Sequence, residues 1–585
     1  MANIAGKVFR VVGPVVELDE VASLRMLDMV EVGDEHLVGE VVRLKEDRAY
    51  VQVYEDTTSI KAGDPVYSEG YPLYVELGPG LIGGIYDGIQ RPLKVIQEKE
   101  GIFIKRGVHV SALNKEKKWH FVPTKKENDP IQQGEAIGEV QETSLVKHKI
   151  LVQANIKGKI KWIAKEGDYS LNEKIASVTE EQGEKEVFMY QRWPVRKPRP
   201  SLERQMVSEP LITGQRVVDT LFPVAKGGCV AVPGGFGTGK TVVQHQLAKW
   251  SNADIVIFVG CGERGNEMTD VLLNFTKLID PRTNRPLSER TIFIANTSNM
   301  PVAAREASIY TGITLAEYYR DMGYNVALMA DSTSRWAEAL RELSGRLEEM
   351  PIEEGFPAYL PSRLAEFYER AGKVKTLNKE DGSITIIASI SPQGGDFSEP
   401  VTSHTKRFVR CFWALDKDLA NSRHYPSISW IDSYSEYLDD IKGWWHKNID
   451  ESWLSLRYEI MELLQKEQHL LQVVKLVGPD VLPQTQRLVL EVCSIFKNTF
   501  LQQSAFDKVD AYSSARKQFL MLKITLHFYH KSEELVKKGI GVEELKEIPI
   551  YKEIMRMKFT YTENDLEKLA KLPEEIDKVL AQLGA

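Results

Sequence analysis

The residues best suited to chemistry form a glycine-rich segment, GGFGTGKT, at positions 234–241. It matches the phosphate-loop pattern GxxxxGK[ST], in which glycines free backbone N–H groups to surround phosphate oxygens. A short apolar run ending at Val232 precedes it, and a helical pattern from Val242 to Trp250 follows it. This strand–loop–helix setting is what the pattern requires, because the helix N-terminus favours an anion. The segment therefore predicts a binding site for a nucleoside triphosphate rather than a chance turn.

Two side chains of this loop and one distant carboxylate predict a magnesium site. Lys240 is expected to lie against the β- and γ-phosphates, and the Thr241 hydroxyl to coordinate Mg²⁺. Asp331 directly follows a second apolar run, residues 326–330, and is expected to hold the ion directly or through water. An aspartate after an apolar run is common, so the prediction for Asp331 depends on its pairing with the loop.

Hydrolysis also needs a group that orients water. Glu263 and Arg264 follow the apolar run at residues 255–259. In a parallel sheet the carboxyl ends of strands share one edge, so Glu263 is expected at the edge that holds the phosphate loop. There it could polarise the attacking water, while Arg264 steadies it or contacts phosphate. An exposed, salt-bridged loop would show the same residues, and their position alone leaves both interpretations open.

Five apolar runs supply the elements that position these residues. Runs of this length, apolar on both faces, fit parallel strands covered by helices on each side. The spacing leaves room for a crossover helix between most of them. The runs are residues 229–232, 255–259, 292–295, 326–330 and 384–388.

The remaining chain changes character along its length. Short strand patterns broken by glycine and aspartate favour a small closed β-barrel at the start, and Trp453, Ile460 and Leu464 recur at helical spacing near the end. Residues 194–200 are typical of a rigid linker, and Gly478 and Pro479 are expected to end the first long C-terminal helix. The sequence predicts a multidomain α/β protein with an N-terminal β-barrel (1–72), a connection (73–109), a β-rich insertion (110–190), a RecA-like phosphate-loop core with a mostly parallel sheet (191–440) and a C-terminal helical domain (441–585).

Composition disfavours several classes of protein. A net charge of -8 disfavours a dedicated nucleic-acid binder, which would carry a basic surplus. The four cysteines form no CxxC pair and are expected to be buried free thiols. No apolar run approaches the ~18 residues of a membrane span, and the start lacks a signal-peptide core. The chain is therefore expected in the cytoplasm, with membrane contact only through a docked complex.

Taken together, these residues resemble the catalytic A subunit of V-type and archaeal A-type rotary ATPases over essentially the whole chain. Beyond the phosphate loop, three long strings carry the resemblance. They are GCGERGNEMTD at residues 260–270, NTSNMPVAAREAS at 296–308 and ADSTSRWAEA at 330–339.

The resemblance assigns roles that spacing could not. It implies that Glu263 is the catalytic carboxylate with Arg264 as its phosphate-side partner, and that Glu267 is a second carboxylate near magnesium-bound water. It also implies that Tyr425 and Phe506 wall the adenine pocket, although sequence alone would favour core packing for both. The predicted catalytic residues are Glu263, Lys240 and Arg264; the metal residues are Thr241, Asp331 and Glu267; and the residues that bind ATP or ADP are Gly234, Gly235, Phe236, Gly237, Thr238, Gly239, Lys240, Thr241, Val242, Tyr425, Gln503 and Phe506.

Two positions depart from the family pattern. Gly235 stands where proline or alanine is frequent, which is expected to loosen the loop backbone without removing a phosphate ligand. Tyr425 stands where phenylalanine is common, which adds a hydroxyl and keeps the stacking face.

The resemblance further implies an assembly. Three copies would alternate with three non-catalytic B subunits around a rotating shaft, with the site at the A–B interface and an arginine finger supplied by B. Central- and peripheral-stalk subunits would connect this ring to a membrane sector that moves H⁺ or Na⁺, and the chain would lie peripherally at the cytoplasmic face of the membrane. Two alternatives remain: a hexameric RecA-like motor acting on nucleic acid or protein, and a non-catalytic nucleotide-binding ring subunit, which would be expected to lack Lys240 or Glu263.

Overall fold

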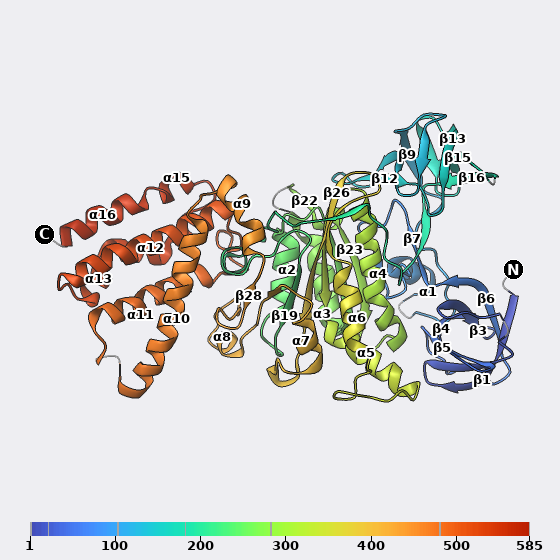
Figure 1. The fold of residues 1–585 in the computed structure, drawn as a ribbon, viewed down its shortest axis with the longest axis horizontal. Coiled ribbons are helices and arrows are strands. Elements are labelled where there is room, and N and C mark those ends of the chain that lie inside the picture. Colours follow the sequence, from blue (N-terminus) through green and yellow to red (C-terminus); the bar gives the residue numbers. More distant parts are fainter. Residues whose placement is uncertain are drawn as a thin grey trace. The chain divides into compact units, whose positions relative to one another are not determined.

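The computed structural model describes residues 3–21, 23–101, 104–181, 183–280, 283–478 and 481–583 (Figure 1). The chain forms two compact units, each assembled from segments that are distant in sequence. Unit 1 contains Met1–Met206, Gly227–Ala231 and Ala253–Val409, and unit 2 contains Val207–Lys226, Val232–Asn252 and Arg410–Ala585.

Unit 1 begins with a closed barrel. Its strands follow the order β1-β2-β5-β4-β3-β6, and every neighbouring pair is antiparallel. Alternate side chains such as Val16, Val30 and Val51 fill its apolar core, and closure leaves no unpaired sheet edge. The strands are β1 (Asn3–Val12), β2 (Val15–Asp19), β3 (Asp28–Val32), β4 (Leu37–Lys45), β5 (Arg48–Val53) and β6 (Pro65–Pro72).

A β-rich insertion follows, built as two four-stranded sheets with orders β10-β13-β15-β16 and β12-β11-β9-β14. The strand β7 (Tyr74–Leu77) precedes the insertion in the sequence, and β17 (Gln191–Pro194) follows it. These two strands pair with each other. The strands of the insertion are β9 (Lys118–Pro123), β10 (Pro130–Gln132), β11 (Ala136–Gln141), β12 (Lys147–Leu151), β13 (Lys157–Ile163), β14 (Gly167–Ser170), β15 (Lys174–Glu180) and β16 (Gly183–Phe188).

The main sheet of unit 1 follows the order β19-β26-β24-β20-β23-β8. The pairs β26–β24, β24–β20, β20–β23 and β23–β8 are all parallel. The helices α4 and α5 pack along this sheet (Figure 1). The side chains of α4 are buried over almost its whole length. These elements are β8 (Ile85–Tyr86), β19 (Cys229–Pro233), β20 (Ile255–Glu263), β23 (Thr291–Thr297), β24 (Asn325–Asp331), β26 (Asp381–Ile390), α4 (Val302–Asp321) and α5 (Thr333–Arg346).

Smaller elements complete unit 1. The strand β25 (Gly372–Lys375) pairs antiparallel with β26, and β18 (Glu203–Gln205) pairs with β25. The strands β21 (Ile279–Asp280) and β22 (Arg285–Pro286) form a separate small hairpin. The helices are α1 (Leu93–Glu100), α3 (Gly265–Lys277), α6 (Leu360–Glu369) and α7 (Pro400–Thr405).

Unit 2 holds the phosphate-loop helix α2 (Lys240–Trp250) and the C-terminal helices. The long helices α10, α11 and α12 contact one another, and α16 packs on α12 (Figure 1). Trp445 and Trp453 stack in its core with ring centroids 4.4 Å apart. The remaining elements are β27 (Cys411–Phe412), α8 (Lys417–Asn421), β28 (Tyr434–Ser435), α9 (Leu438–Asn448), α10 (Trp453–Val477), α11 (Gln484–Phe496), α12 (Ala515–Lys537), α13 (Val542–Glu547), α14 (Pro549–Thr560), α15 (Leu566–Leu569) and α16 (Leu572–Leu583).

The predicted fold class is confirmed: a barrel, a β-rich insertion, a core with a mostly parallel sheet and a helical C-terminal part. The predicted domain bounds stay predictions. The helix α10 ends at Val477 with Gly478 as its cap residue, and Pro479 lies outside the described residues. The four cysteines, all within the described ranges, are thiols rather than disulfides; three are buried and Cys229 is partly exposed. In the described part of the chain, no helix has the length and apolar character of a membrane span.

Candidate active site

The phosphate loop, residues 234–239, joins β19 to α2 in unit 2. Gly237 and Gly239 have φ angles of 79° and 86°, in the left-handed region that favours glycine. A Cβ added to Gly234 would lie 2.6 Å from Thr238 Oγ1 and 2.8 Å from Leu415 Cβ, closer than atoms pack. These glycines therefore let the loop close tightly at the start of α2.

Carbonyl groups of the loop accept hydrogen bonds from the side chains of Lys240 and Thr238. Lys240 Nζ donates to the oxygens of Gly234 and Gly235 at 2.5 and 3.1 Å, and Thr238 Oγ1 donates to Gly235 O at 2.8 Å. The cap residue of α2 is Gly239, which has no side chain that could accept from the first N–H groups of the helix. An ammonium group and a helix N-terminus at one place form an anion site.

Two predicted aromatic residues of unit 2 have exposed side chains, and one of them, Tyr425, lies beside this loop. The Tyr425 ring comes within 3.4 Å of a Cβ built on Gly239, and 42% of the residue is exposed. Phe506 is 90% exposed. The backbone N–H of Gln503 donates to Tyr425 O at 2.8 Å, which ties the two aromatic segments together. Neither ring packs in a core, so the core packing that sequence alone would favour is wrong for both residues.

Gln503 has a different environment from the aromatic residues. Its side chain is buried, and its amide donates to Gly214 O at 2.8 Å and to Asp510 O at 2.9 Å. Its amide oxygen accepts the backbone N–H of Arg216 at 2.8 Å. The side chain therefore holds the protein backbone, and direct contact with nucleotide through Gln503 stays a prediction.

The predicted carboxylates lie in unit 1, at one edge of the main sheet. Glu263 is the last residue of β20 and Asp331 the last residue of the adjacent parallel strand β24, with Gly260 opposite Asp331 in the register. Glu267 lies in the first turn of α3, with its Oε1 3.9 Å from Arg264 Nη1. The strands therefore bring Glu263 and Asp331 to the same edge, as their order in the sequence predicted.

Glu263 has a strongly shifted acidity. Burial, then the negative charges of Asp331 and Glu267, raise the pKa of Glu263 to about 7, and the nearby Arg335 partly offsets this. A carboxyl group with a pKa in this range can accept a proton near neutral pH. Glu263 thus combines partial burial with the nearby negative charges of Asp331 and Glu267.

The carboxylates of this edge supply the kind of oxygen donor that a magnesium ion takes. Carboxylates that crowd one another gain from a divalent cation, and Mg²⁺ commonly takes only one or two of them together with phosphate oxygens. Within the described ranges, no group of three or more acidic, histidine or cysteine side chains forms a metal site by itself. The predicted metal residues Asp331 and Glu267 belong to unit 1 and Thr241 to unit 2. Their shared role in holding magnesium stays a prediction.

Two further residues of this edge were not predicted as site residues. Ser389 Oγ donates a hydrogen bond to Asp331 Oδ1, which orients that carboxylate. Arg335 carries a positive charge that acts on Glu263. Ser389 directly follows the apolar run at residues 384–388, so the argument that placed Asp331 at the sheet edge could have found it. Arg335 lies within one of the three family strings, but its charge acts on Glu263 only because of the turn from β24 into α5.

Family models cover most of the chain. A model of the ATP synthase alpha/beta family, nucleotide-binding domain, matches residues 214–435, and the beta-barrel domain of the same family matches 8–70. The barrel-sandwich domain of the ATP synthase alpha/beta subunit matches residues 110–196. The C-terminal domain of V and A type ATP synthase matches residues 442–546.

Curated relatives match along the full length. The V-type ATP synthase alpha chain of Halothermothrix orenii is 56% identical over 580 residues, covering 99% of this chain and 98% of that one. The A subunit of the A-type ATP synthase of Hyperthermus butylicus is 56% identical over 587 residues, with the same coverage. A solved structure of the ATPase EscN of the enteropathogenic E. coli type III secretion system covers 89% of this chain and all of its own, with a TM-score of 0.62 and 21% identity. At that identity, the likeness to EscN is one of fold alone.

Proposed function

The chain belongs to the ATP synthase alpha/beta family as an A subunit of the A-type and V-type enzymes, and on that basis we propose that Glu263 activates water against ATP held by residues 234–241. Its activity is that of an ATP hydrolase or synthase coupled to ion translocation. One observation carries the proposal for the site. The same chain holds an anion-binding loop and, at the end of β20, a carboxyl group with a pKa raised to about 7.

Each residue of the site has a distinct proposed task. The N–H groups of the loop and the Lys240 ammonium bind the phosphates and balance their charge. Glu263 polarises the attacking water and takes its proton, and Arg264 stabilises the phosphate side. Thr241, Asp331 and Glu267 are the proposed holders of Mg²⁺, which when bound neutralises charge on the phosphate oxygens. Tyr425 and Phe506 stack on the adenine.

We further propose that the site is completed by another chain. Three copies alternate with three B subunits, whose arginine finger stabilises the transferring phosphoryl group, and stalk subunits connect the ring to a membrane sector. The chain then lies peripherally at the cytoplasmic face of the membrane. Lys240 and Glu263 are both present, which supports a catalytic rather than a purely structural ring subunit. The net charge of -8 gives no support to an action on nucleic acid.

Reconstitution tests this proposal. The full-length chain alone is expected to be a poor ATPase and to gain activity when it is mixed with a B-type subunit, because an arginine finger contributes roughly 10³–10⁵ in rate. The measurement is steady-state ATP hydrolysis, with size-exclusion chromatography to detect a six-membered ring and the isolated B-type partner as control. Full activity of the isolated chain would refute the shared site.

A further inference from the structure

The Phe506 loop, residues 502–511, is closed by its own carboxylates. Asp507 Oδ1 accepts the backbone N–H groups of Val509 and Asp510, each at 2.8 Å. Asp510 Oδ2 accepts the backbone N–H of Ser504 at 2.7 Å. Because the Phe506 side chain is almost fully exposed, its position depends on the backbone of this loop rather than on packing of the ring.

The side chain of a buried arginine, Arg216, binds groups at both ends of this loop. Arg216 Nη1 lies 2.7 Å from Asp510 Oδ1, and both side chains are fully buried. Arg216 Nε donates to Phe500 O at 2.7 Å, and its Nη2 donates to Gln502 O at 2.8 Å. The arginine thus connects the start of the loop to Asp510 near its end.

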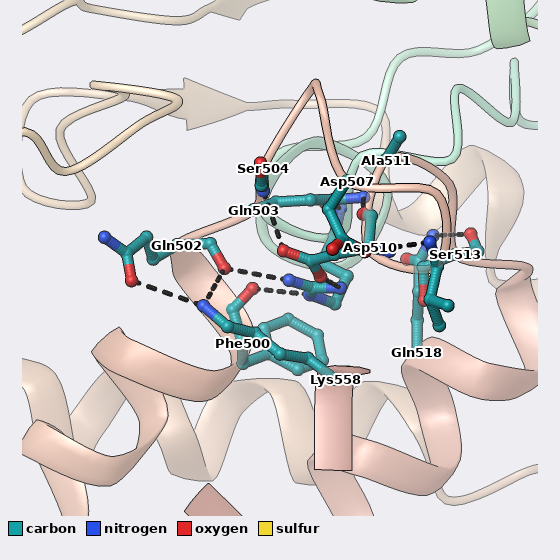
Figure 2. A network of polar contacts seen from close by, with 12 residues as sticks. Phe500, Gln502, Gln503, Ser504, Asp507, Asp510, Ala511, Ser513, Gln518 and Lys558 are labelled. Carbon is teal, nitrogen blue, oxygen red and sulfur yellow. Dashed lines mark hydrogen bonds and ion pairs between the residues drawn. The ribbon is translucent and has the colours of Figure 1, made fainter. Parts of the chain in front are cut away.

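A second buried cation reaches the same carbonyl from a different helix. Lys558 on α14 is 5% exposed, and its Nζ donates to Asn498 O at 2.7 Å. It also donates to both Gln502 O and Gln502 Oε1 at 3.2 Å (Figure 2). All three acceptors are neutral oxygens. Burial lowers the pKa of Lys558 to about 8 despite the attraction of Asp510. Burying an ammonium beside another cation costs stability, so packing alone gives no reason for a lysine here.

Lys558 links α14 to the chain segments that carry Phe506 and Tyr425. Gln502 carries the start of the Phe506 loop, and the next residue, Gln503, donates its backbone N–H to Tyr425 O. We propose that Lys558 is a positioning residue for binding of the nucleotide base. Its hydrogen bonds hold the Phe506 loop against α14, so that this helix determines where Phe506 lies. The inference rests on the proposed function, because it assumes that Phe506 contacts the base.

Replacing Lys558 tests the inference in the full-length chain. Lys558→Met keeps the length of the side chain and removes its donors and charge, and we expect Mg-ATP affinity to fall about tenfold, as for loss of a charge-assisted hydrogen bond. Lys558→Arg should retain most of the affinity. The matched control is Lys552→Met, because Lys552 lies on the same helix and is exposed. Isothermal titration calorimetry measures affinity, and circular dichroism melting identifies any variant that fails to fold.

A double-mutant cycle separates positioning from general destabilisation. Phe506→Ala should itself weaken Mg-ATP binding about tenfold, since base–aromatic stacking contributes roughly 1–3 kcal/mol. In that background Lys558→Met should have little further effect, because the ring that it positions is gone. Equal effects of Lys558→Met with and without Phe506 would overturn the inference while leaving the proposed function intact. No effect of Phe506→Ala on affinity would remove the base-binding role and the inference with it.

The pH dependence gives a readout that a purely structural lysine would not produce. Below its pKa of about 8 the Lys558 side chain is an ammonium, and above it the amine loses a charge and a donor. Mg-ATP affinity of the wild-type chain should therefore fall as the pH rises through about 8, and Lys558→Arg should not show this fall. The other ionisable groups that interact with Lys558 are Asp510, Arg216, Asp507 and His424, which the wild-type chain and Lys558→Arg both retain. The same fall in Lys558→Arg would assign it to another group and contradict the inference.

Discussion

The phosphate loop of unit 2 and the carboxylate edge of unit 1 use different parts of the chain. The loop works through backbone: Gly234 admits close packing, Gly239 takes a left-handed φ, and loop carbonyls hold Lys240. The edge consists of side chains at strand ends, where burial and the negative charge of Asp331 raise the pKa of Glu263. One region offers positive charge and N–H groups, and the other offers negative charge and a proton acceptor.

Under the proposed function, this difference gives the two regions separate tasks. An anion site made of backbone N–H groups and the Lys240 ammonium holds phosphate, so it should control affinity. A carboxyl group with a raised pKa exchanges a proton near neutral pH, so it controls turnover. Variants of the edge should therefore change kcat, and variants of the loop should change affinity.

The largest effect is expected at the edge, for Glu263→Gln. An amide cannot accept the proton of water, so kcat of the assembled enzyme should fall about 10²–10⁴-fold, the usual contribution of a general base. Mg-ATP binding, measured by calorimetry, should persist. Glu342→Gln on α5 is the control, because Glu342 is a partly exposed carboxylate paired with Arg346. Normal turnover of Glu263→Gln would mean that another group activates water.

The same variant should also change stability. The pKa of Glu263 is raised from 4.5 to about 7 in the folded chain, so its ionisation costs stability progressively between these two values. Above pH 7 the full cost is present in the wild-type chain and absent in Glu263→Gln. Without metal at pH 8, the melting temperature of the variant should equal or exceed that of the wild type, and a lower value would contradict the origin of the shift.

The next largest effect is expected in the loop, for Lys240→Ala. Loss of the ammonium removes a charge-assisted contact with phosphate, and Mg-nucleotide affinity should fall roughly 10–100-fold, as for a hydrogen bond to a charged group. Lys249→Ala is the matched control, because Lys249 lies near the opposite end of α2, roughly 13 Å along its axis. Calorimetry with Mg-ATP and Mg-ADP measures the change. If Lys240→Ala retains its Mg-nucleotide affinity and only its kcat falls, the loop acts in turnover rather than in binding, and the proposed division between the two regions is wrong.

Local patterns explain what the sequence could predict. Apolar runs located every strand of the main sheet except the two-residue β8, and strand order then placed Glu263 and Asp331 at one edge. The strand β20 nevertheless continues to Glu263 itself rather than ending near Val259. The phosphate loop was recognisable because glycine spacing and a following helix are local features.

Contacts between distant segments could not be predicted in this way. Residues 194–200 read as a linker, yet Arg196 forms buried ion pairs with Glu40 and Glu306 in unit 1, 2.8 and 2.7 Å away. Arg216 and Lys558 likewise donate hydrogen bonds to Gln502 of the Phe506 loop, from which they are separated by 286 and 56 positions in the sequence. No periodicity marks such residues, because each partner is set by tertiary packing.

The smallest effect is expected at Tyr425, the family departure that can be tested most directly. The ring carbons of Tyr425 approach the Gly239 position at 3.4 and 3.6 Å, and Tyr425→Phe keeps these atoms. We therefore expect Mg-ATP affinity to stay unchanged in Tyr425→Phe, whereas Tyr425→Ala should lose about tenfold, within the roughly 1–3 kcal/mol of base–aromatic stacking. Calorimetry on the full-length chain compares the two variants. A substantial loss in Tyr425→Phe would show that the hydroxyl contacts nucleotide, and binding in unit 2 would then depend on a side-chain polar group as well as on the loop.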